Sequence, residues 1–394
     1  MYSSVAKGAI IKVIGVGGAG CNAVANMITA NVKATQFAAV NTDLQALELS
    51  PAEIRIPIGA ECTKGLGAGS NPDVGEKAAE ESKEELTEFI KDTDLLFIAA
   101  GMGGGTGTGA APVIARLAKE MGILTVAFVT KPFMFEGRPR SENAIKGINN
   151  LKKYVDTLVV IPNDKLTQSL PGSTSFIDAF KIADNLLKQG ISGIVDLIMT
   201  PSHINLDFAD ISTIMRNQGL AHMGIGVAKG EKRVIEAVRQ AVSSPLLETT
   251  IEGARGVILN VAGGKSLGLG EINEAATLVG GIIDDSANII LGTTCDESLG
   301  DELKITVIAT GFNPIIQEEI TARAPVGQPS LFEKSFVAEP TPVVEVAKEV
   351  DEFEIEEEVA QEPVKEEVAP VKEEVVEDNV PAFIKYLRRR KKSN

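Results

Sequence analysis

Short apolar runs alternate with segments of helical periodicity through the first half of the chain. Strand-like runs are residues 10–16, 36–42, 94–100, 124–130 and 157–163, and helix-like segments are residues 23–28, 111–122 and 143–155. A strand pattern that regularly gives way to a helix pattern is typical of βαβ units. The sequence therefore predicts an α/β protein with a doubly wound, Rossmann-like parallel sheet.

A long helix and a smaller domain are expected next. Residues 176–199 keep apolar side chains at helical spacing, which predicts one long central helix that tolerates Gly190 and Gly193 and ends at Pro201. Candidate strands then lie at 223–230, 254–264, 287–296 and 305–311, with helices at 231–242 and 271–279. Residues 204–312 are therefore expected to form a smaller α+β domain.

The composition changes sharply beyond residue 312. Residues 315–378 carry 19 acidic and 5 basic side chains and repeat the sequence PVKEEV at 363–368 and 370–375. Because such a segment buries too little apolar surface to offset its ordering entropy, we expect a disordered acidic linker. Its r.m.s. end-to-end distance would be about 45 Å. Residues 379–394 carry six bases and no acid.

Composition also limits the function. The net charge is −16, but the linker holds −14 and the final segment +6, so residues 1–314 carry only −8, which gives no support for general nucleic-acid binding.

Cys21, Cys62 and Cys295 are far apart and the chain has two histidines, so a His/Cys metal centre is not expected. The N-terminus has no signal-peptide pattern, and six glycines within 101–109 argue against a membrane helix there. We expect a cytoplasmic protein.

Glycine-rich loops follow two of the predicted strands. The first, residues 15–20, fits G-x-G-x-x-G and is followed by an acid, Asp43, which taken alone suggests a nicotinamide-dinucleotide enzyme. The second, residues 101–109, leads into a helix with Pro112 near its expected first turn, and a third glycine-rich stretch lies at 65–75. Such loops let backbone N–H groups wrap phosphate oxygens at a helix N-terminus.

Other readings of these loops stay open on the residues alone. A single glycine-rich loop is as often an irregular turn. A P-loop is not expected, because GGKS at 263–266 has Leu259 where the first glycine of that motif is required. Two strand-to-helix loops together favour a phosphate ligand.

GGGTGTG at 103–109 resembles the signature loop of the tubulin/FtsZ superfamily. Similarity to its bacterial FtsZ branch runs from about residue 10 to 312 and includes GVGGAGCNAV, VNTDLQAL, GLGAGSNPDVG, PFMFEGRPR, IPNDKL, DAFKIADNLL, NLDFADISTIM and VIATGF. The resemblance implies a GTPase that polymerises head to tail and forms the bacterial division ring at midcell. The competing functions are a nicotinamide dehydrogenase, which leaves the second loop unexplained, and a tubulin-like scaffold that binds GTP without hydrolysing it.

The resemblance also implies domain boundaries. These are a GTP-binding domain at 10–175, the central helix at 176–201, a C-terminal domain with a catalytic loop at 202–314, the linker at 315–378 and a partner-binding peptide at 379–394. The implied ligands are GTP and GDP with Mg²⁺, and with K⁺ as a candidate second ion; no fixed site made of protein ligands alone is expected for the metal.

Site residues are carried over from the same motifs. The implied phosphate contacts are Gly17, Gly18, Ala19, Gly20, Cys21, Asn22, Gly103, Gly104, Gly105, Thr106, Gly107 and Thr108, with Asp43 on the phosphate and metal side. Glu136 and Arg140 would contact the ribose and phosphate side. Asn163 and Asp184 would read the guanine edge, with Phe180 against the base. A carboxylate can accept from both guanine N1–H and the 2-amino group, a pattern that adenine does not present.

Asp207 and Asp210, in NLDFADISTIM at 205–215, supply a second group of candidates. Three residues apart, they share a face of a helical turn and could polarise a water molecule. A helix of 24 residues is about 36 Å long, however, so the pair cannot reach its own nucleotide. The resemblance implies that this loop, with Asn205, completes the site of the next subunit. The alternative is an acid pair that caps a helix N-terminus. Ser202-His203, before the loop, departs from the family's usual Gly-Leu and leaves the turnover rate open.

The C-terminal segment DNVPAFIKYLRRRKKSN resembles the short FtsZ partner peptide. Pro381, Phe383 and Ile384 are the expected apolar anchors for membrane-anchoring and regulatory division proteins. Five consecutive bases at 388–392 could also touch anionic lipid, each contributing about 1 kcal/mol. The alternative for these bases is a frayed solubilising tail.

Overall fold

The computed structural model describes residues 8–33, 36–169, 173–199, 206–244, 251, 253–283 and 286–312, with residues 167–169 described by their backbone alone. All of them belong to one compact unit, Met1–Gly327. The expected linker at 315–378, the expected peptide at 379–394 and Asn205 lie outside the described residues.

One sheet of ten strands runs through this unit in the order β3-β2-β1-β4-β5-β6-β7-β10-β8-β9. The strands are β1 (Ile11–Val16), β2 (Gln36–Asn41), β3 (Ile54–Pro57), β4 (Leu95–Gly101), β5 (Leu124–Lys131), β6 (Thr157–Pro162), β7 (Gly219–Lys229), β8 (Gly256–Gly263), β9 (Asn288–Cys295) and β10 (Glu302–Thr310). The first six are parallel and form the N-terminal sheet. Their order, 3-2-1-4-5-6, is that of the Rossmann fold, so the predicted doubly wound sheet is confirmed.

β7 joins the N-terminal sheet to the C-terminal sheet, which consists of β7 to β10. Its first three residues pair with β6 in parallel, in the register Thr157 to Gly219. From His222 onward it pairs with β10 in antiparallel orientation. The sequence predicted this strand from residue 223, so the four residues that connect the two sheets were missed.

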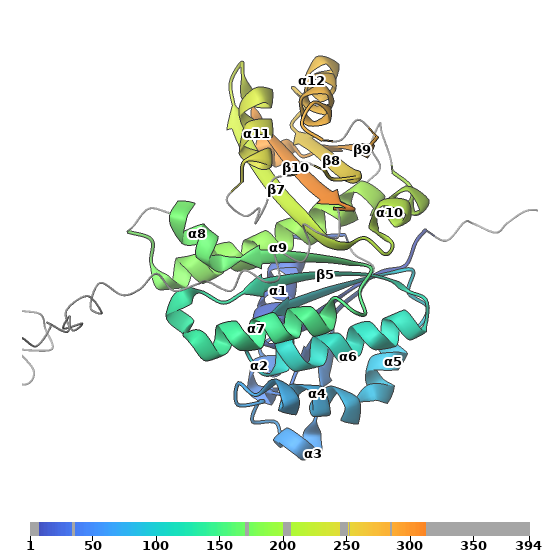
Figure 1. The fold of residues 1–394 in the computed structure, drawn as a ribbon, viewed down its shortest axis with the longest axis vertical. Helices are drawn as coiled ribbons and strands as arrows, with labels where there is room; N and C mark the ends of the chain where they lie inside the picture. The colour runs from blue at the N-terminus through green and yellow to red at the C-terminus, as the bar shows by residue number, and fades with distance from the viewer. Residues whose placement is uncertain are drawn as a thin grey trace, which may run out of the picture. The chain divides into compact units, whose positions relative to one another are not determined.

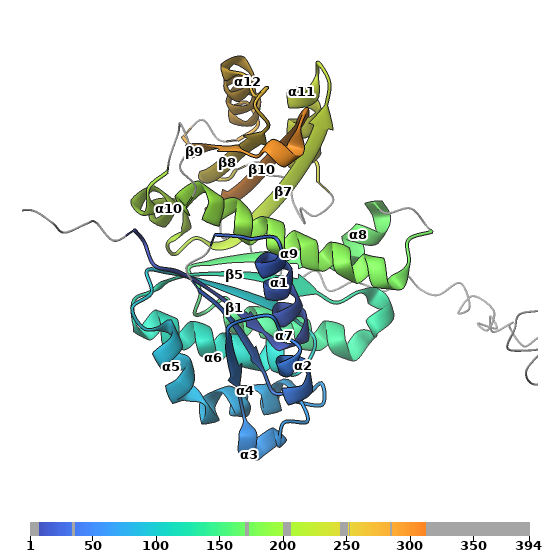
Figure 2. The same ribbon diagram turned by 180° about the vertical axis from the view of Figure 1, so that it is seen from behind.

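Helices cover both faces of the N-terminal sheet (Figures 1 and 2). The helices are α1 (Gly17–Thr29), α2 (Leu44–Glu48), α3 (Ala60–Thr63), α4 (Pro72–Glu81), α5 (Lys83–Ile90), α6 (Thr106–Glu120), α7 (Arg138–Leu151), α8 (Asn163–Ser169), α9 (Phe176–Met199), α10 (Phe208–Met215), α11 (Arg233–Val242) and α12 (Leu269–Gly280). Alternate residues of each strand face opposite sides. Ile14 and Val16 pack with α4 to α7, whereas Ile11 and Val13 pack with α1 and α9.

α9 is the predicted long helix and lies between the two sheets in both views (Figures 1 and 2). Leu187 and Ile191 are fully buried and share one apolar core with Phe128 of β5 and with Ile258 and Ile308 of the C-terminal sheet. The helix therefore connects the two sheets through packing. Within the described residues, no helix combines the length and apolarity needed to cross a membrane.

Two expectations for the N-terminal half were wrong or incomplete. α6 begins at Thr106, so Pro112 lies inside the helix and not in its first turn. The Thr-Gly-Thr-Gly stretch before Pro112 is already helical, because the first turn of α6 packs closely on α4: a Cβ at Gly109 would lie 2.0 Å from the Pro72 carbonyl oxygen. α4 and α5 were not predicted, because both are short and half of their residues are charged.

The two glycines within α9 make a matched test of its packing. A Cβ at Gly190 would lie 2.5 Å from Phe128 Cε1 and 2.8 Å from Met223 Sδ, whereas one at Gly193 would meet Thr306 Cγ2 at 3.6 Å, an ordinary contact. We expect Gly190→Ala to lower the free energy of unfolding by about 1–3 kcal/mol through overpacking. Gly193→Ala should raise it by up to about 1 kcal/mol, because alanine has the higher helix propensity.

Urea denaturation of the full chain, followed by circular dichroism, measures both changes. Equal effects of the two substitutions would show that α9 does not pack closely against β5 and β7 at Gly190.

Candidate functional site

The glycine loops that follow β1 and β4 lie side by side, because these two strands are neighbours in the sheet. α1 begins at Gly17, directly after β1, and α6 begins at Thr106, shortly after β4. Gly17 has φ +71°, and a Cβ there would lie 2.8 Å from the backbone nitrogen of Gly107. The first turns of two helices therefore present their unpaired N–H groups to one place at the carboxyl edge of the sheet.

A cavity of about 440 Å³ lies at this edge. The residues expected from the sequence that line it are Gly17, Gly18, Ala19, Asn22, Gly104, Gly105, Thr106, Gly107, Glu136, Arg140, Asn163, Phe180 and Asp184. A Cβ added at Gly18 or Gly104 would meet no other atom within 4 Å, so both loops leave open space on the cavity side. This is an arrangement that lets backbone approach an anionic group.

Burial leaves two polar side chains at one end of the cavity in need of a partner. Asn163, the first residue of α8, is 4% exposed, and its Oδ1 accepts no hydrogen bond from the described residues. Asp184 of α9 is partly buried, and this burial raises the pKa of its carboxyl group to about 7. Both groups would be satisfied by a ligand that presents N–H donors.

Aromatic rings lie beside these two groups. Phe180, one turn before Asp184 on α9, also lines the cavity, and its ring contacts those of Phe133 and Phe176 with centroid separations of 5.1 and 4.9 Å. Phe133 is fully buried, so Phe180 rests on a fixed support. A flat apolar ligand group can pack against such a ring.

Glu136 and Arg140 form a fixed pair at the cavity. The Phe133 N–H donates to Glu136 Oε1 at 2.9 Å, and Arg140 Nη1 donates to Glu136 Oε2 at 2.5 Å. The Glu136 side chain is 11% exposed, whereas that of Arg140 is 46% exposed. The carboxylate therefore orients the guanidinium, whose remaining donors stay accessible to an anion.

Five of the expected residues do not line the cavity. The Cys21 thiol donates to the carbonyl oxygens of Gly15 and Val40, and burial raises its pKa to about 11, so it stays protonated in the core. Gly20 packs against the Ala99 carbonyl oxygen. The Asp43 carboxylate caps α2 by accepting from Gln45 and Ala46 N–H groups.

Gly103 and Thr108 support the second loop from behind. Gly103 has φ +107°, and its N–H donates to Thr108 Oγ1 at 2.8 Å. Further lining residues, not named individually from the sequence, are Gly101, Met102, Thr130, Pro132 and Ala183; all but Thr130 lie within the expected glycine loop or the quoted motifs. Thr130 lies at the end of β5 and Pro132 directly follows it. Because β5 is the neighbour of β4 in the sheet, their position near the second glycine loop could have been anticipated.

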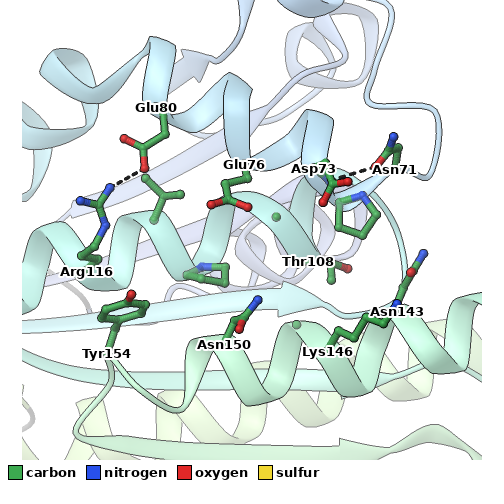
Figure 3. Close-up of a pocket in the computed structure, with 15 residues that line it drawn as sticks. Asn71, Asp73, Glu76, Glu80, Thr108, Arg116, Asn143, Lys146, Asn150 and Tyr154 are labelled. Carbon is green, nitrogen blue, oxygen red and sulfur yellow. Dashed lines mark hydrogen bonds and ion pairs between the residues drawn. The ribbon is translucent and has the colours of Figure 1, made fainter.

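A second cavity, of about 360 Å³, lies between α4, α6 and α7 (Figure 3). Asp73, Glu76 and Glu80 line it from α4, and Glu80 forms an ion pair with Arg116 of α6. Lys146 also lines this cavity, but the carboxylates of Asp73 and Glu76 outnumber it, since Arg116 is paired with Glu80. The cavity is therefore a weaker candidate for an anion than the first.

Asp207 is the N-cap of α10 and Asp210 lies in its first turn. α10 lies near the end of α9 that is far from the cavity (Figure 1). The Asp210 N–H donates to Asp207 Oδ1 at 2.8 Å, and the Asp207 N–H donates to Asp210 Oδ2 at 3.3 Å. The pair thus forms a capping box, the alternative that the sequence left open. Both residues are exposed, and within the described residues each carboxylate uses only one oxygen in the cap.

The comparisons with known proteins agree with this geometry. Residues 10–171 match the model of the tubulin/FtsZ family GTPase domain, and residues 219–313 match that of the FtsZ family C-terminal domain. An FtsZ dimer from M. jannaschii is 45% identical, with a TM-score of 0.75 over 77% of this chain and 89% of that chain.

Two more distant structures share the fold. CetZ2 of Haloferax volcanii, as a GTPγS-bound protofilament, is 19% identical, with a TM-score of 0.68 over 79% of this chain and 96% of that chain. CetZ1 of the same organism, a GDP-bound monomer, is 22% identical, with a TM-score of 0.69 over 79% of this chain and 97% of that chain. With two successive domain matches and 45% identity across most of its length, the chain belongs to the tubulin/FtsZ family of GTPases, and within it to FtsZ.

Proposed function

We propose that the cavity between the two glycine loops binds GTP and that the chain hydrolyses it during head-to-tail assembly. The observation that carries this proposal is the single cavity in which two helix N-termini face one end and the unsatisfied groups of Asn163 and Asp184 face the other. A phosphate chain suits the first end and a purine base the second. The GTPγS and GDP complexes of CetZ2 and CetZ1 support a guanine nucleotide.

Guanine suits the base end better than adenine. The ionised Asp184 carboxylate accepts from guanine N1–H and the 2-amino group, and the Asn163 amide can both donate and accept. Phe180 packs against the ring. Adenine presents an acceptor at N1 and lacks the 2-amino donor, so it would leave Asp184 buried without a partner.

Magnesium is proposed to enter with the nucleotide. The described residues contain no group of three or more His, Cys, Asp or Glu that could hold a metal ion. Mg²⁺ would therefore be held chiefly by β- and γ-phosphate oxygens, where it neutralises charge. The Thr106 hydroxyl, which lines the cavity, is an oxygen ligand of the kind that Mg²⁺ accepts. K⁺ is a candidate second ion.

Hydrolysis requires a second subunit in this proposal. Asp207 and Asp210 lie beyond the end of a 24-residue helix, about 36 Å long, so they do not act on the nucleotide of their own chain. In a head-to-tail contact they would face the nucleotide of the next subunit, where the free carboxylate oxygens orient water. Asn205, which lies outside the described residues, is proposed to contribute to the same site. An interface of this kind does not close and gives filaments. The FtsZ dimer and the CetZ2 protofilament support self-assembly.

The cellular role follows from the family. We propose that the filaments form the division ring at midcell, in the cytoplasm, and that residues 379–394 bind membrane-anchoring and regulatory division proteins through Pro381, Phe383 and Ile384. At each contact, the GTP-binding domain (10–175) of one subunit would then meet the C-terminal domain (202–314) of the next subunit. A scaffold that binds GTP without turnover is the alternative function.

Replacing Asp210 by Asn tests catalysis without removing the helix cap. The amide oxygen of the new asparagine can still accept from the Asp207 N–H, but the negative charge of the Asp210 carboxylate is lost. We expect Asp210→Asn to lower phosphate release from GTP by about 10²-fold or more. Pelleting with GTP and the free energy of unfolding should stay near the wild-type values.

Mixing two inactive variants tests whether the site is shared. Asp184→Ala weakens nucleotide binding but keeps an intact Asp207 and Asp210 pair, so it can complete the site of an Asp210→Asn neighbour. We expect the mixture to release phosphate faster than either variant alone. No recovery, or wild-type turnover that does not depend on protein concentration, would contradict hydrolysis in trans.

Asp184 gives the site a pH dependence. The raised carboxyl pKa, about 7, means that the ligand-free protein holds a proton there below that pH, and this proton must leave before guanine N–H groups can be accepted. We expect the dissociation constant of GTP to rise by up to about tenfold for each pH unit below 7 and to level off above it.

Calorimetric titration between pH 5.5 and 8 measures this effect. Asp184→Asn should bind more weakly and lose the pH dependence. Asp178→Asn, which changes an exposed carboxylate on the same helix, should retain it. The same raised pKa implies that ligand-free wild type loses stability relative to Asp184→Asn as the pH rises from about 4 to 7. Affinity that is flat across this range would rule out Asp184 as the group that reads the base.

A further inference from the structure

A pair of buried hydroxyl groups links the second glycine loop to the end of β2. Thr42 Oγ1 and Thr106 Oγ1 lie 2.7 Å apart, although 64 residues separate them in the sequence. Thr42 is 1% exposed and Thr106 is 9% exposed. Thr106 is the first residue of α6 and lines the nucleotide cavity, whereas Thr42 does not.

The backbone of Thr42 is held on both sides. Its N–H donates to Asn41 Oδ1 at 2.9 Å. Its carbonyl oxygen accepts from the Gly67 N–H at 3.1 Å and from Thr63 Oγ1 at 3.4 Å. Its hydroxyl has the Thr106 hydroxyl as its one partner among the described residues. The Thr42 hydroxyl can therefore rotate, but the residue cannot move away from Thr106.

The strand order indicates which part of the nucleotide Thr106 meets. Asn163, at the base end, follows β6, whereas Thr42 follows β2, on the opposite side of β1 and β4. A nucleotide whose base lies on the β6 side places its terminal phosphate toward β2. The 65–71 loop packs against Gly105 on this side, because a Cβ at Gly105 would lie 2.7 Å from Ala68 Cβ.

We propose that Thr42 is a positioning residue that selects the triphosphate. A hydroxyl has one hydrogen to donate and two lone pairs that accept. When Thr42 donates to Thr106, the Thr106 hydrogen is directed into the cavity, where a γ-phosphate oxygen accepts it. GDP has no oxygen at this place, so the contact favours GTP. This inference rests on the proposed function, since it needs GTP in this cavity.

Thr42→Val tests the inference, because valine keeps the shape of threonine and removes the hydroxyl. We expect the affinity for GTPγS to fall about 3- to 10-fold, the usual range for one lost hydrogen bond between neutral groups, while the affinity for GDP changes by less than about twofold. Thr42→Ser should restore the wild-type ratio. Calorimetric titration of the full chain, at concentrations below assembly, measures both nucleotides.

A double-mutant cycle separates positioning from general support of the fold. In a Thr106→Val background there is no hydroxyl to orient, so adding Thr42→Val should not change GTPγS binding further. Thr63→Val, which removes a different hydroxyl of the same loop network, should not change the GTPγS to GDP ratio.

Equal loss of GTPγS and GDP affinity in Thr42→Val, or additive losses in the double variant, would overturn the inference and leave the proposed function intact. Wild type that binds neither nucleotide would overturn the proposed function and, with it, this role of Thr42.

Discussion

The contact between the first turns of α1 and α6 is the constraint on which the rest of the site depends. Backbone meets backbone there, since a Cβ at Gly17 would lie 2.8 Å from the Gly107 nitrogen. This approach is possible only because β1 and β4 are adjacent in the sheet and both loops are rich in glycine. It concentrates two helix N-termini at one point, so the positive potential for a phosphate chain comes mainly from backbone, assisted by Arg140.

The proposed base end of the site depends on a different element, α9, which also connects the two sheets. Asp184 and Phe180 lie near its first turns, whereas Leu187 and Ile191 pack in the core that reaches the C-terminal sheet. A change at the nucleotide base and a shift of the C-terminal sheet therefore act on one continuous helix. The same length that makes α9 a connector separates Asp207 and Asp210 from the cavity, which is why the proposed chemistry needs two subunits.

Sequence patterns predicted the parallel sheet, the long helix and most of the C-terminal strands, because these elements carry strong apolar periodicity. α4 and α5 escaped prediction because both are short and half of their residues are charged, although Leu86, Phe89 and Ile90 form an apolar stripe on α5. The glycine loops correctly marked a place where two helices begin, and phosphate binding there stays a prediction. Thr130 was missed because only strand adjacency brings it to the cavity. The Asp207 and Asp210 capping box was visible in the three-residue spacing, which by itself does not distinguish capping from catalysis.

β7 has a mechanical consequence for the proposed filaments. Three residues of this strand, Gly219 to Ala221, pair with β6, whereas eight residues, from His222 to Lys229, pair with β10. A tensile or twisting load between the two sheets thus passes through a short parallel ladder and the packing of α9, while the C-terminal sheet resists as a rigid plate. The three-residue pairing of β6 with β7 is the shorter of the two, so we expect bending of a loaded filament to concentrate there.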